Sequence, residues 1–179
     1  MSNAPNTLIT LAYEARREGR SQDAKQLFDK AVKFCRAAAD QAMLARSLTG
    51  LAQIERDLKN NVQAIQHYLE AATIYRSLPD PLRVAHTIRH VGDILRSQGS
   101  LDRARPCYEE ALTIYREHGE TSPLDLANAI RGFALLRADA GETEQAKALW
   151  QEARTLYNAA GVQPGVQESD AQIERLARP

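Results

Sequence analysis

Three polar side chains near the middle of the sequence have the spacing and the chemistry of metal ligands. His86, His90 and Asp93 are separated by four and three residues, so a helix would place them on one face. Two imidazoles and a carboxylate can bind zinc or another transition metal. The alternative is a set of ordinary polar surface residues. The lack of a recognisable fourth ligand favours this alternative, and we expect no bound metal.

The two cysteines are the other candidates for reactivity. Cys35 and Cys107 form no CxxC motif, which favours free thiols over a disulfide. Cys107 precedes Tyr108 in a helix that is expected to pack in the core, so we expect Cys107 to be a buried structural residue and not a catalytic nucleophile. The sequence also contains no glycine-rich phosphate loop, nucleophile elbow or HExxH motif. We therefore expect a protein that is not an enzyme and that uses no cofactor.

Composition narrows the range of partners. The 179 residues include 23 lysines and arginines and 23 aspartates and glutamates, for a net charge of zero. This balance argues against strong non-specific binding to nucleic acid. Apolar runs are short and interrupted by charge, and the first ten residues lack the features of a secretory signal. We expect a cytoplasmic protein of one domain's length without membrane or nucleic-acid partners.

A pattern of small and aromatic residues recurs every 40 to 42 positions. Its anchoring alanines are Ala24, Ala64, Ala104 and Ala146. Four residues after each alanine comes an aromatic, namely Phe28, Tyr68, Tyr108 and Trp150. A period in this range predicts a stack of similar structural units, each of which contacts mainly its neighbours.

Each repeat is expected to form two helices, because its apolar residues are spaced three and four apart. The expected helices are 6–18, 21–37, 41–58, 61–77, 81–97, 101–118, 123–140 and 143–160. Asp40, Asp80 and Ser122 are expected N-caps at the junctions between repeats. Within repeats, Asn60 and Ser100 are expected to cap the second helix, and glycine or asparagine at the turn suits a left-handed C-cap.

These anchors resemble the tetratricopeptide repeat family, whose first helix carries a large-small pair. The corresponding pairs are Leu11-Ala12, Leu51-Ala52, Val91-Gly92 and Phe133-Ala134. The resemblance covers about residues 5–160, and the period of about 40 is similar to the longer-helix subgroup. It implies an all-α fold: a right-handed superhelical solenoid of four helix-turn-helix repeats within residues 1–161. The expected repeats are 5–38, 41–78, 81–119 and 123–160.

The remaining residues, 162–179, contain a short apolar edge on a polar segment. We expect a linker and a C-terminal capping helix that covers the last repeat, since the terminal units of a solenoid need a soluble outer side. A swapped or partner-binding helix is the alternative.

The family resemblance also implies that the first helices line a concave groove. Mapping by the anchors gives candidate partner-binding residues Tyr13, Arg16, Arg46, Gln53, Arg56, His86, Arg89, His90, Asp93, Arg96, Asn128 and Arg131. The same mapping adds Asn6, Ile9, Arg17, Thr49, Asp57, Leu135 and Asp139. The six arginines of the first group can pair with carboxylates or phosphates of an acidic peptide. Alternatively, they lie on a solvated face and pair with Asp57, Asp93 and Asp139.

The function that the resemblance implies is protein–protein interaction: a module or adaptor that binds a peptide or protein partner in the groove, with an acidic partner as one candidate. Two alternatives stay open. One is a structural or self-association unit, which would be a homodimer rather than a monomer. The other is a regulatory component of a signalling assembly.

Overall fold

The computed structural model describes residues 4–178, and the regular structure in this range is entirely α-helical. The chain divides into two compact units, Met1–Thr87 and Ile88–Pro179, with the boundary inside helix α5 (Pro81–Ser97). The predicted all-α class and its helix-turn-helix architecture are confirmed. The right-handed twist of the superhelix stays a prediction.

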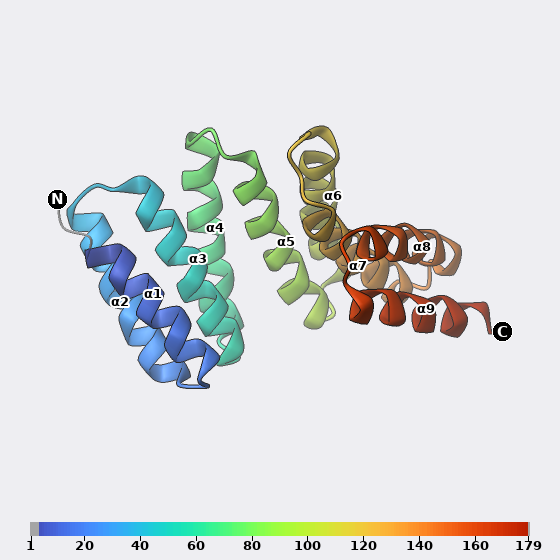
Figure 1. Ribbon diagram of the computed structural model, residues 1–179, viewed down its shortest axis with the longest axis horizontal. Helices are drawn as coiled ribbons and strands as arrows, with labels where there is room; N and C mark the ends of the chain where they lie inside the picture. Colours follow the sequence, from blue (N-terminus) through green and yellow to red (C-terminus); the bar gives the residue numbers. More distant parts are fainter. Residues whose placement is uncertain (1–3, 179) are drawn as a thin grey trace. The chain divides into compact units, whose positions relative to one another are not determined.

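Unit 1 consists of four antiparallel helices and the first turns of α5 (Figure 1). Its helices are α1 (Ala4–Arg17), α2 (Ser21–Ala37), α3 (Gln41–Asp57) and α4 (Asn61–Ser77). Helix α3 contacts α1, α2 and α4, and more than half of its residues are buried. The first helix of the second repeat is therefore the centre of this unit.

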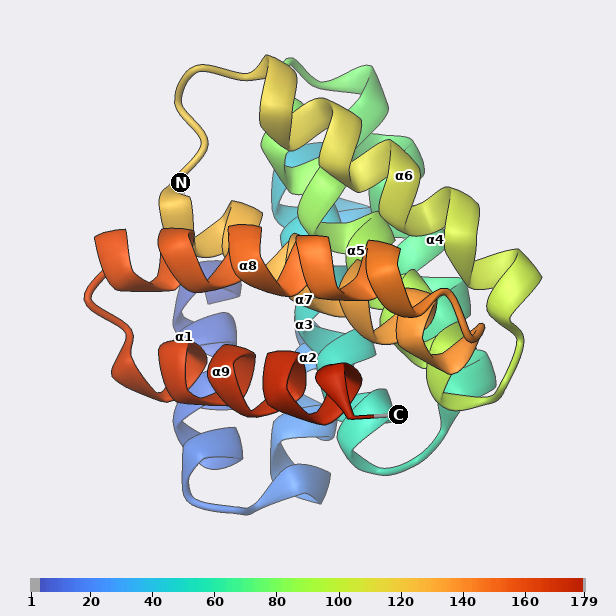
Figure 2. The same ribbon diagram turned by 90° about the vertical axis from the view of Figure 1, so that its right-hand side faces the viewer.

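Unit 2 contains the rest of α5 and four further helices. These are α6 (Leu101–Glu117), α7 (Pro123–Asp139), α8 (Thr143–Ala159) and α9 (Gln163–Ala177). Helix α7 packs against α6 and α8, and α9 packs against α8. Figure 2 shows α8 and α9 lying side by side. The eight helices expected within the repeats all begin and end within two residues of the observed positions.

The helix α9 is held on unit 2 by close packing and by charge. Gly165 lies against the ring of Tyr157, where an added Cβ would be 2.5 Å from a ring carbon. Glu168 accepts from Arg131 of α7, and Asp170 accepts from Arg154 of α8. The residues after Gly161 thus cover α8 within their own unit.

The turns inside the repeats share one hydrogen bond but not one residue type. In each, the residue just before the second helix donates its N–H to the carbonyl five residues earlier, as Asn60 does to Glu55 at 2.8 Å. The residue before it has a positive φ, which is why three of the four are glycine. In the second repeat this residue is Lys59, with φ of 66°, and not the expected asparagine.

The expected caps divide by location. Asp40, Asp80 and Ser122 accept from the backbone N–H three residues later, as predicted for the junctions between repeats. The side chains of Asn60 and Ser100 form no capping hydrogen bond, so those two predictions were wrong. The Asn60 amide instead donates to Glu55 Oε2 at 2.7 Å, because the tight turn places it beside that buried carboxylate.

The anchors of the repeat form the core. All four anchoring alanines and all four aromatics are 0 % exposed. Two of the aromatics reach the following repeat: an added Cβ on Gly50 would lie 2.2 Å from the Phe28 ring, and one on Gly132 would lie 2.5 Å from the Tyr108 ring. The large residue of each large-small pair is also buried except in the first repeat, where Leu11 is 45 % exposed.

None of the helices in the described part of the chain has the length and apolar character needed to cross a membrane.

Candidate functional site

Four of the candidate residues of unit 1 line an open hollow on its first helices. The hollow has a volume of about 460 Å³ and is lined by Tyr13, Arg16, Arg17 and Asp57. Arg16 donates to Asp57 Oδ2 at 2.7 Å and to Gln53 Oε1 at 3.3 Å, which joins α1 to α3. The hydrogen bond from Arg16 to Asp57 raises the pKa of the guanidinium further. Arg17 is exposed beside this pair.

Tyr13 forms the apolar wall of the hollow. Its ring meets Phe28 edge-on, with centroids 5.1 Å apart and an angle of 82° between the planes. This T-shaped arrangement fixes the Tyr13 ring. Burial raises the pKa of Tyr13, so its hydroxyl stays protonated at neutral pH.

The other two arginines of unit 1 lie along α3. Arg46 is exposed and donates to Asn6 Oδ1 of α1 at 3.2 Å. Arg56 is half-buried near the end of the helix. His86 is half-buried in the part of α5 that belongs to unit 1.

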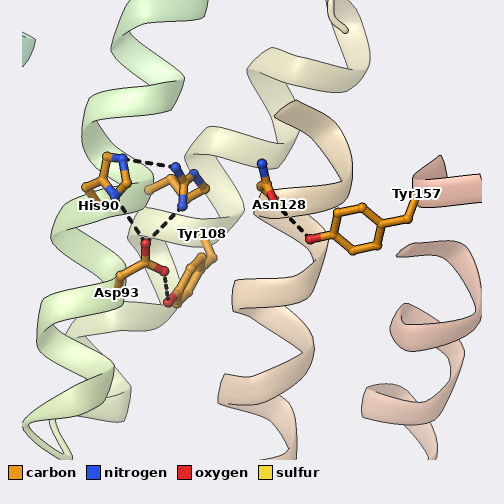
Figure 3. Close-up of polar contacts among 6 residues, drawn as sticks. His90, Asp93, Tyr108, Asn128 and Tyr157 are labelled. Carbon is orange, nitrogen blue, oxygen red and sulfur yellow. Dashed lines mark hydrogen bonds and ion pairs between the residues drawn. The ribbon is translucent and has the colours of Figure 1, made fainter. Parts of the chain in front are cut away.

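The candidate residues of unit 2 include a compact polar cluster (Figure 3). Asp93 of α5 accepts from Arg89 at 2.9 Å and from the hydroxyl of Tyr108 at 2.8 Å. His90 Nδ1 lies 3.2 Å from Asp93 Oδ2, and its Nε2 lies 3.0 Å from Arg89 Nη2. Because a guanidinium can only donate, Nε2 must accept, and the proton on Nδ1 then points at Asp93.

These contacts control the ionisation of the cluster. Burial alone would raise the pKa of Asp93, but the hydrogen bond from His90 and the charge of Arg89 outweigh it and lower the pKa to about 2. Burial and the neighbouring Asp93 charge raise the pKa of Tyr108. The cluster therefore holds a carboxylate, a guanidinium and a neutral phenol together at neutral pH.

The cluster bears directly on the metal hypothesis. Both ring nitrogens of His90 are engaged, and Arg89 occupies Nε2, so a cation binding there would have to displace a guanidinium. No group of three metal-ligating side chains is placed to hold an ion among residues 4–178.

Two further arginines of the mapping, Arg96 and Arg131, lie in unit 2. Arg96 donates to Asp139 at 2.7 Å, which repeats the Arg16–Asp57 contact of unit 1. Arg131 forms two hydrogen bonds with Glu168, at 2.6 and 2.7 Å. With Arg16 and Arg89, four of the six predicted arginines are paired with carboxylates of the chain. The alternative of arginines paired with Asp57, Asp93 and Asp139 thus describes the observed geometry of three of them.

Two mapped residues do not face a groove. Ile9 is 0 % exposed and belongs to the core, because α1 turns this apolar side toward its neighbours. Thr49 is buried and its hydroxyl donates to the Ala45 carbonyl at 2.9 Å. Leu135 is half-buried.

The sequence analysis missed the polar role of two tyrosines. The hydroxyl of Tyr108 bonds Asp93, and the hydroxyl of Tyr157 donates to Asn128 Oδ1 at 2.8 Å (Figure 3). The repeat pattern marks Tyr108 as a packing aromatic and predicts no polar role for either tyrosine. The available signal was their type, since Phe28 and Cys35 stand at the same positions in the first repeat and have no hydroxyl.

Both cysteines are free thiols. Cys35 is buried with its sulfur 3.9 Å from Ser47 Oγ, and Cys107 donates to the Arg103 carbonyl at 3.6 Å. Burial raises the pKa of both thiols, so neither is an activated nucleophile.

Comparison with known families identifies these repeats. The model of the tetratricopeptide repeat matches residues 3–77 and 83–159, which is most of the chain. The chain belongs to the tetratricopeptide repeat family. Each of the two matches spans two of the four helix-turn-helix repeats.

Individual relatives of this tetratricopeptide repeat chain are distant. Regulatory protein AfsR of Streptomyces griseus is 27 % identical over 101 residues, covering 56 % of the chain and 10 % of AfsR. The structure of BtubC (BKLC) from P. vanneervenii has a TM-score of 0.79 at 24 % identity, covering 88 % of this chain and 64 % of BtubC. Aspartyl phosphate phosphatase F from Bacillus subtilis has a TM-score of 0.88 at 15 % identity, covering 99 % and 47 %. The chain thus spans less than two thirds of each, and the two structural likenesses establish the fold.

Proposed function

We propose that the chain is a protein-interaction module that binds a peptide or protein partner through the polar side chains of its first helices. The observation that carries the proposal is the hollow of unit 1, whose lining combines one aromatic ring with two guanidinium groups. Concave sites with an apolar wall and a few convergent polar groups are the usual places for ligands. Membership of the tetratricopeptide repeat family supports a protein partner.

The charges of the hollow favour an acidic segment of the partner. Arg16 is already paired with Asp57, whereas the side chain of Arg17 forms no ion pair or hydrogen bond among residues 4–178. A carboxylate that enters the hollow can therefore pair with Arg17 without displacing Asp57. In unit 2 the arginines Arg89, Arg96 and Arg131 already have carboxylate partners. We accordingly place the acidic contact in unit 1 and not along all six predicted arginines.

Binding of labelled peptides by fluorescence anisotropy would test this proposal. We expect a glutamate-rich peptide to bind more tightly than a matched glutamine-rich one, and the difference to shrink at high salt, because exposed charges are screened. Arg17→Gln should reduce the preference, whereas Arg103→Gln, an exposed arginine on α6, is a matched control that should not. Equal affinity for the two peptides, or binding that salt does not change, would contradict the acidic contact.

A regulatory role is the second candidate, and the match to a protein named as regulatory supports it. In that case the partner would belong to a signalling assembly. Cross-linking in source cells followed by mass spectrometry should recover a signalling protein with the wild type and lose it with Arg16→Gln plus Arg17→Gln. Recovery that both variants share equally would speak against a regulatory partner held in the hollow.

The repeat subgroup and the oligomeric state are two further proposals. We infer that the repeats belong to the longer-helix subgroup, since α3, α5, α7 and α9 begin 40, 42 and 40 residues apart. Self-association as a homodimer stays a prediction, which light scattering over a range of concentrations would test. A mass that does not change with concentration would favour the monomer.

A further inference from the structure

The outer side of the first repeat exposes two large apolar residues at positions that are buried or half-buried in the later repeats. We call it the end face and define it by Leu11, Arg17, Lys30 and Phe34. Leu11 is 45 % exposed and Phe34 is 40 % exposed. Phe133, which occupies the position of Leu11 in the fourth repeat, is 8 % exposed and contacts Tyr108 of the preceding repeat with ring centroids 6.0 Å apart. The Leu11 position is therefore one that faces a neighbouring helix.

Charge at the end face is reversed relative to the other stacked repeats. Seven residues before the anchoring alanine, the second and fourth repeats have Asp57 and Asp139, which accept from arginines of the preceding repeat. The first repeat has Arg17 at this position.

The same reversal occurs on the second helix. Six residues after the anchoring alanine, the second and fourth repeats have Glu70 and Glu152, which pair with Arg36 and Arg116 of the preceding repeat. The first repeat has Lys30 there. Lys30 and Arg17 are both exposed, and neither forms an ion pair among the residues that the structure describes.

We infer that the end face docks an amphipathic helix whose apolar stripe is flanked by carboxylates. The position of Leu11 matches one that packs against the preceding repeat in unit 2, and Phe34 adds a second exposed apolar side chain. Both charged positions, Arg17 and Lys30, favour a partner of negative charge. Helix α9 shows this chemistry in unit 2, where Glu168 and Asp170 pair with Arg131 and Arg154.

A second copy that docks through its own end face fits poorly. Pairing of two end faces would bring Arg17 and Lys30 toward the same cations of the other copy, and like charges in contact are unfavourable. The proposal goes beyond the hollow of unit 1, because Lys30, Leu11 and Phe34 do not line it. Only Arg17 borders both surfaces.

Two designed peptides would test the inference on the full chain. Each is a labelled helix of about 17 residues with the same leucine stripe, flanked by glutamates in one and by lysines in the other. In anisotropy titrations we expect the glutamate-flanked helix to bind about tenfold more tightly, as two surface ion pairs allow. Lys30→Glu should reduce this preference about fivefold, and Leu11→Ser should weaken the binding of both peptides.

Controls separate this site from the hollow and from general charge effects. Arg103→Glu changes the net charge by the same amount on α6 and should leave the preference intact. Arg16→Gln, which acts in the hollow, should also leave it intact. Circular dichroism establishes that each variant is folded. Equal binding of the two peptides, no effect of Lys30→Glu, or a dimer in sedimentation experiments that Leu11→Ser abolishes would each overturn the inference.

Discussion

In unit 1 and in unit 2, two repeats stack through contacts at the same positions. The two units differ in the residue that lies beside the buried aromatic ring of the first stacked repeat, Phe28 in unit 1 and Tyr108 in unit 2. The shared contacts between repeats are Arg16–Asp57 and Arg36–Glu70 in unit 1, and Arg96–Asp139 and Arg116–Glu152 in unit 2. In both units a glycine of the following helix also lies against the aromatic, Gly50 on Phe28 and Gly132 on Tyr108. The geometry of stacking has thus been kept in both units.

The difference lies beside the aromatic ring. In unit 1 the ring of Phe28 meets Tyr13, and in unit 2 the hydroxyl of Tyr108 bonds Asp93, which stands at the position of Tyr13. A buried phenylalanine can be satisfied by another ring, whereas a buried tyrosine needs an acceptor for its hydroxyl. The two positions therefore change together.

A polar contact at the turn inside the second and fourth repeats also differs between the units, because its hydrogen-bond acceptor and donor exchange places. In unit 1 the buried Glu55 accepts from Lys25 and Asn60. In unit 2 the position of Glu55 is occupied by Arg137, which pairs with Glu142 at the position of Asn60. Both units therefore keep a hydrogen-bonded polar pair at these two positions, but the carboxylate stands at the first position in unit 1 and at the second in unit 2.

The largest expected effect comes from adding a side chain at Gly50, the glycine that lies against the Phe28 ring. An added Cβ on Gly50 would approach the Phe28 ring to 2.2 Å, whereas one on Gly92 would meet its neighbours at 3.2 Å. We expect Gly50→Ala to lower the free energy of unfolding by about 1–3 kcal/mol, with a smaller loss for Gly92→Ala. Urea denaturation measures both. Phe28→Leu should partly rescue Gly50→Ala, and full additivity of the two changes would show that the contact is not the cause.

Acid should affect unit 2 through Asp93, which has no counterpart in unit 1. The folded pKa of Asp93 is lowered from 3.8 to about 2. The ionised carboxylate thus stabilises the fold fully above about pH 4, and this contribution is lost as the pH falls toward 2. The expected loss is about 2 kcal/mol. Denaturation of the wild type and of Asp93→Asn across this range measures it. Parallel pH curves for the two proteins would refute the assignment.

Exchanging the aromatic partners should show that they act as pairs. Phe28→Tyr places a hydroxyl in unit 1 without a carboxylate at position 13, and we expect a cost of about 1–3 kcal/mol. Adding Tyr13→Asp recreates the pair of unit 2 and should recover part of that cost. Thermal unfolding of the single and double variants forms the cycle. If the double variant loses more stability than the two single variants lose together, the two residues do not act as a pair.

The smallest effects are expected at the shared ion pairs between second helices. Arg36–Glu70 and Arg116–Glu152 are exposed, so Arg36→Gln and Arg116→Gln should each cost about 0.2–1 kcal/mol, and less in high salt. Urea midpoints at two salt concentrations measure the difference. A large loss in only one unit would show that the two pairs are not equivalent.

Much of the fold follows from local signals in the sequence. Helix positions came from spacing and from caps such as Asp40 and Ser122, which act on their own first turn. Asn60 failed as a cap because a buried carboxylate from the previous helix competes for its side chain. Ile9 failed as a groove residue because its burial depends on how neighbouring helices pack against α1.

The repeat, its register and most of the packing residues follow from the sequence alone, because helical periodicity and small-residue contacts recur at a constant spacing. The sequence left two alternatives open for the arginines, and the packing of the helices shows which charges meet. Arg16 and Asp57 are 41 residues apart in the chain, and the bond from Tyr108 to Asp93 joins two helices. Such pairs depend on the relative placement of helices and on side-chain rotamers, which no local pattern encodes.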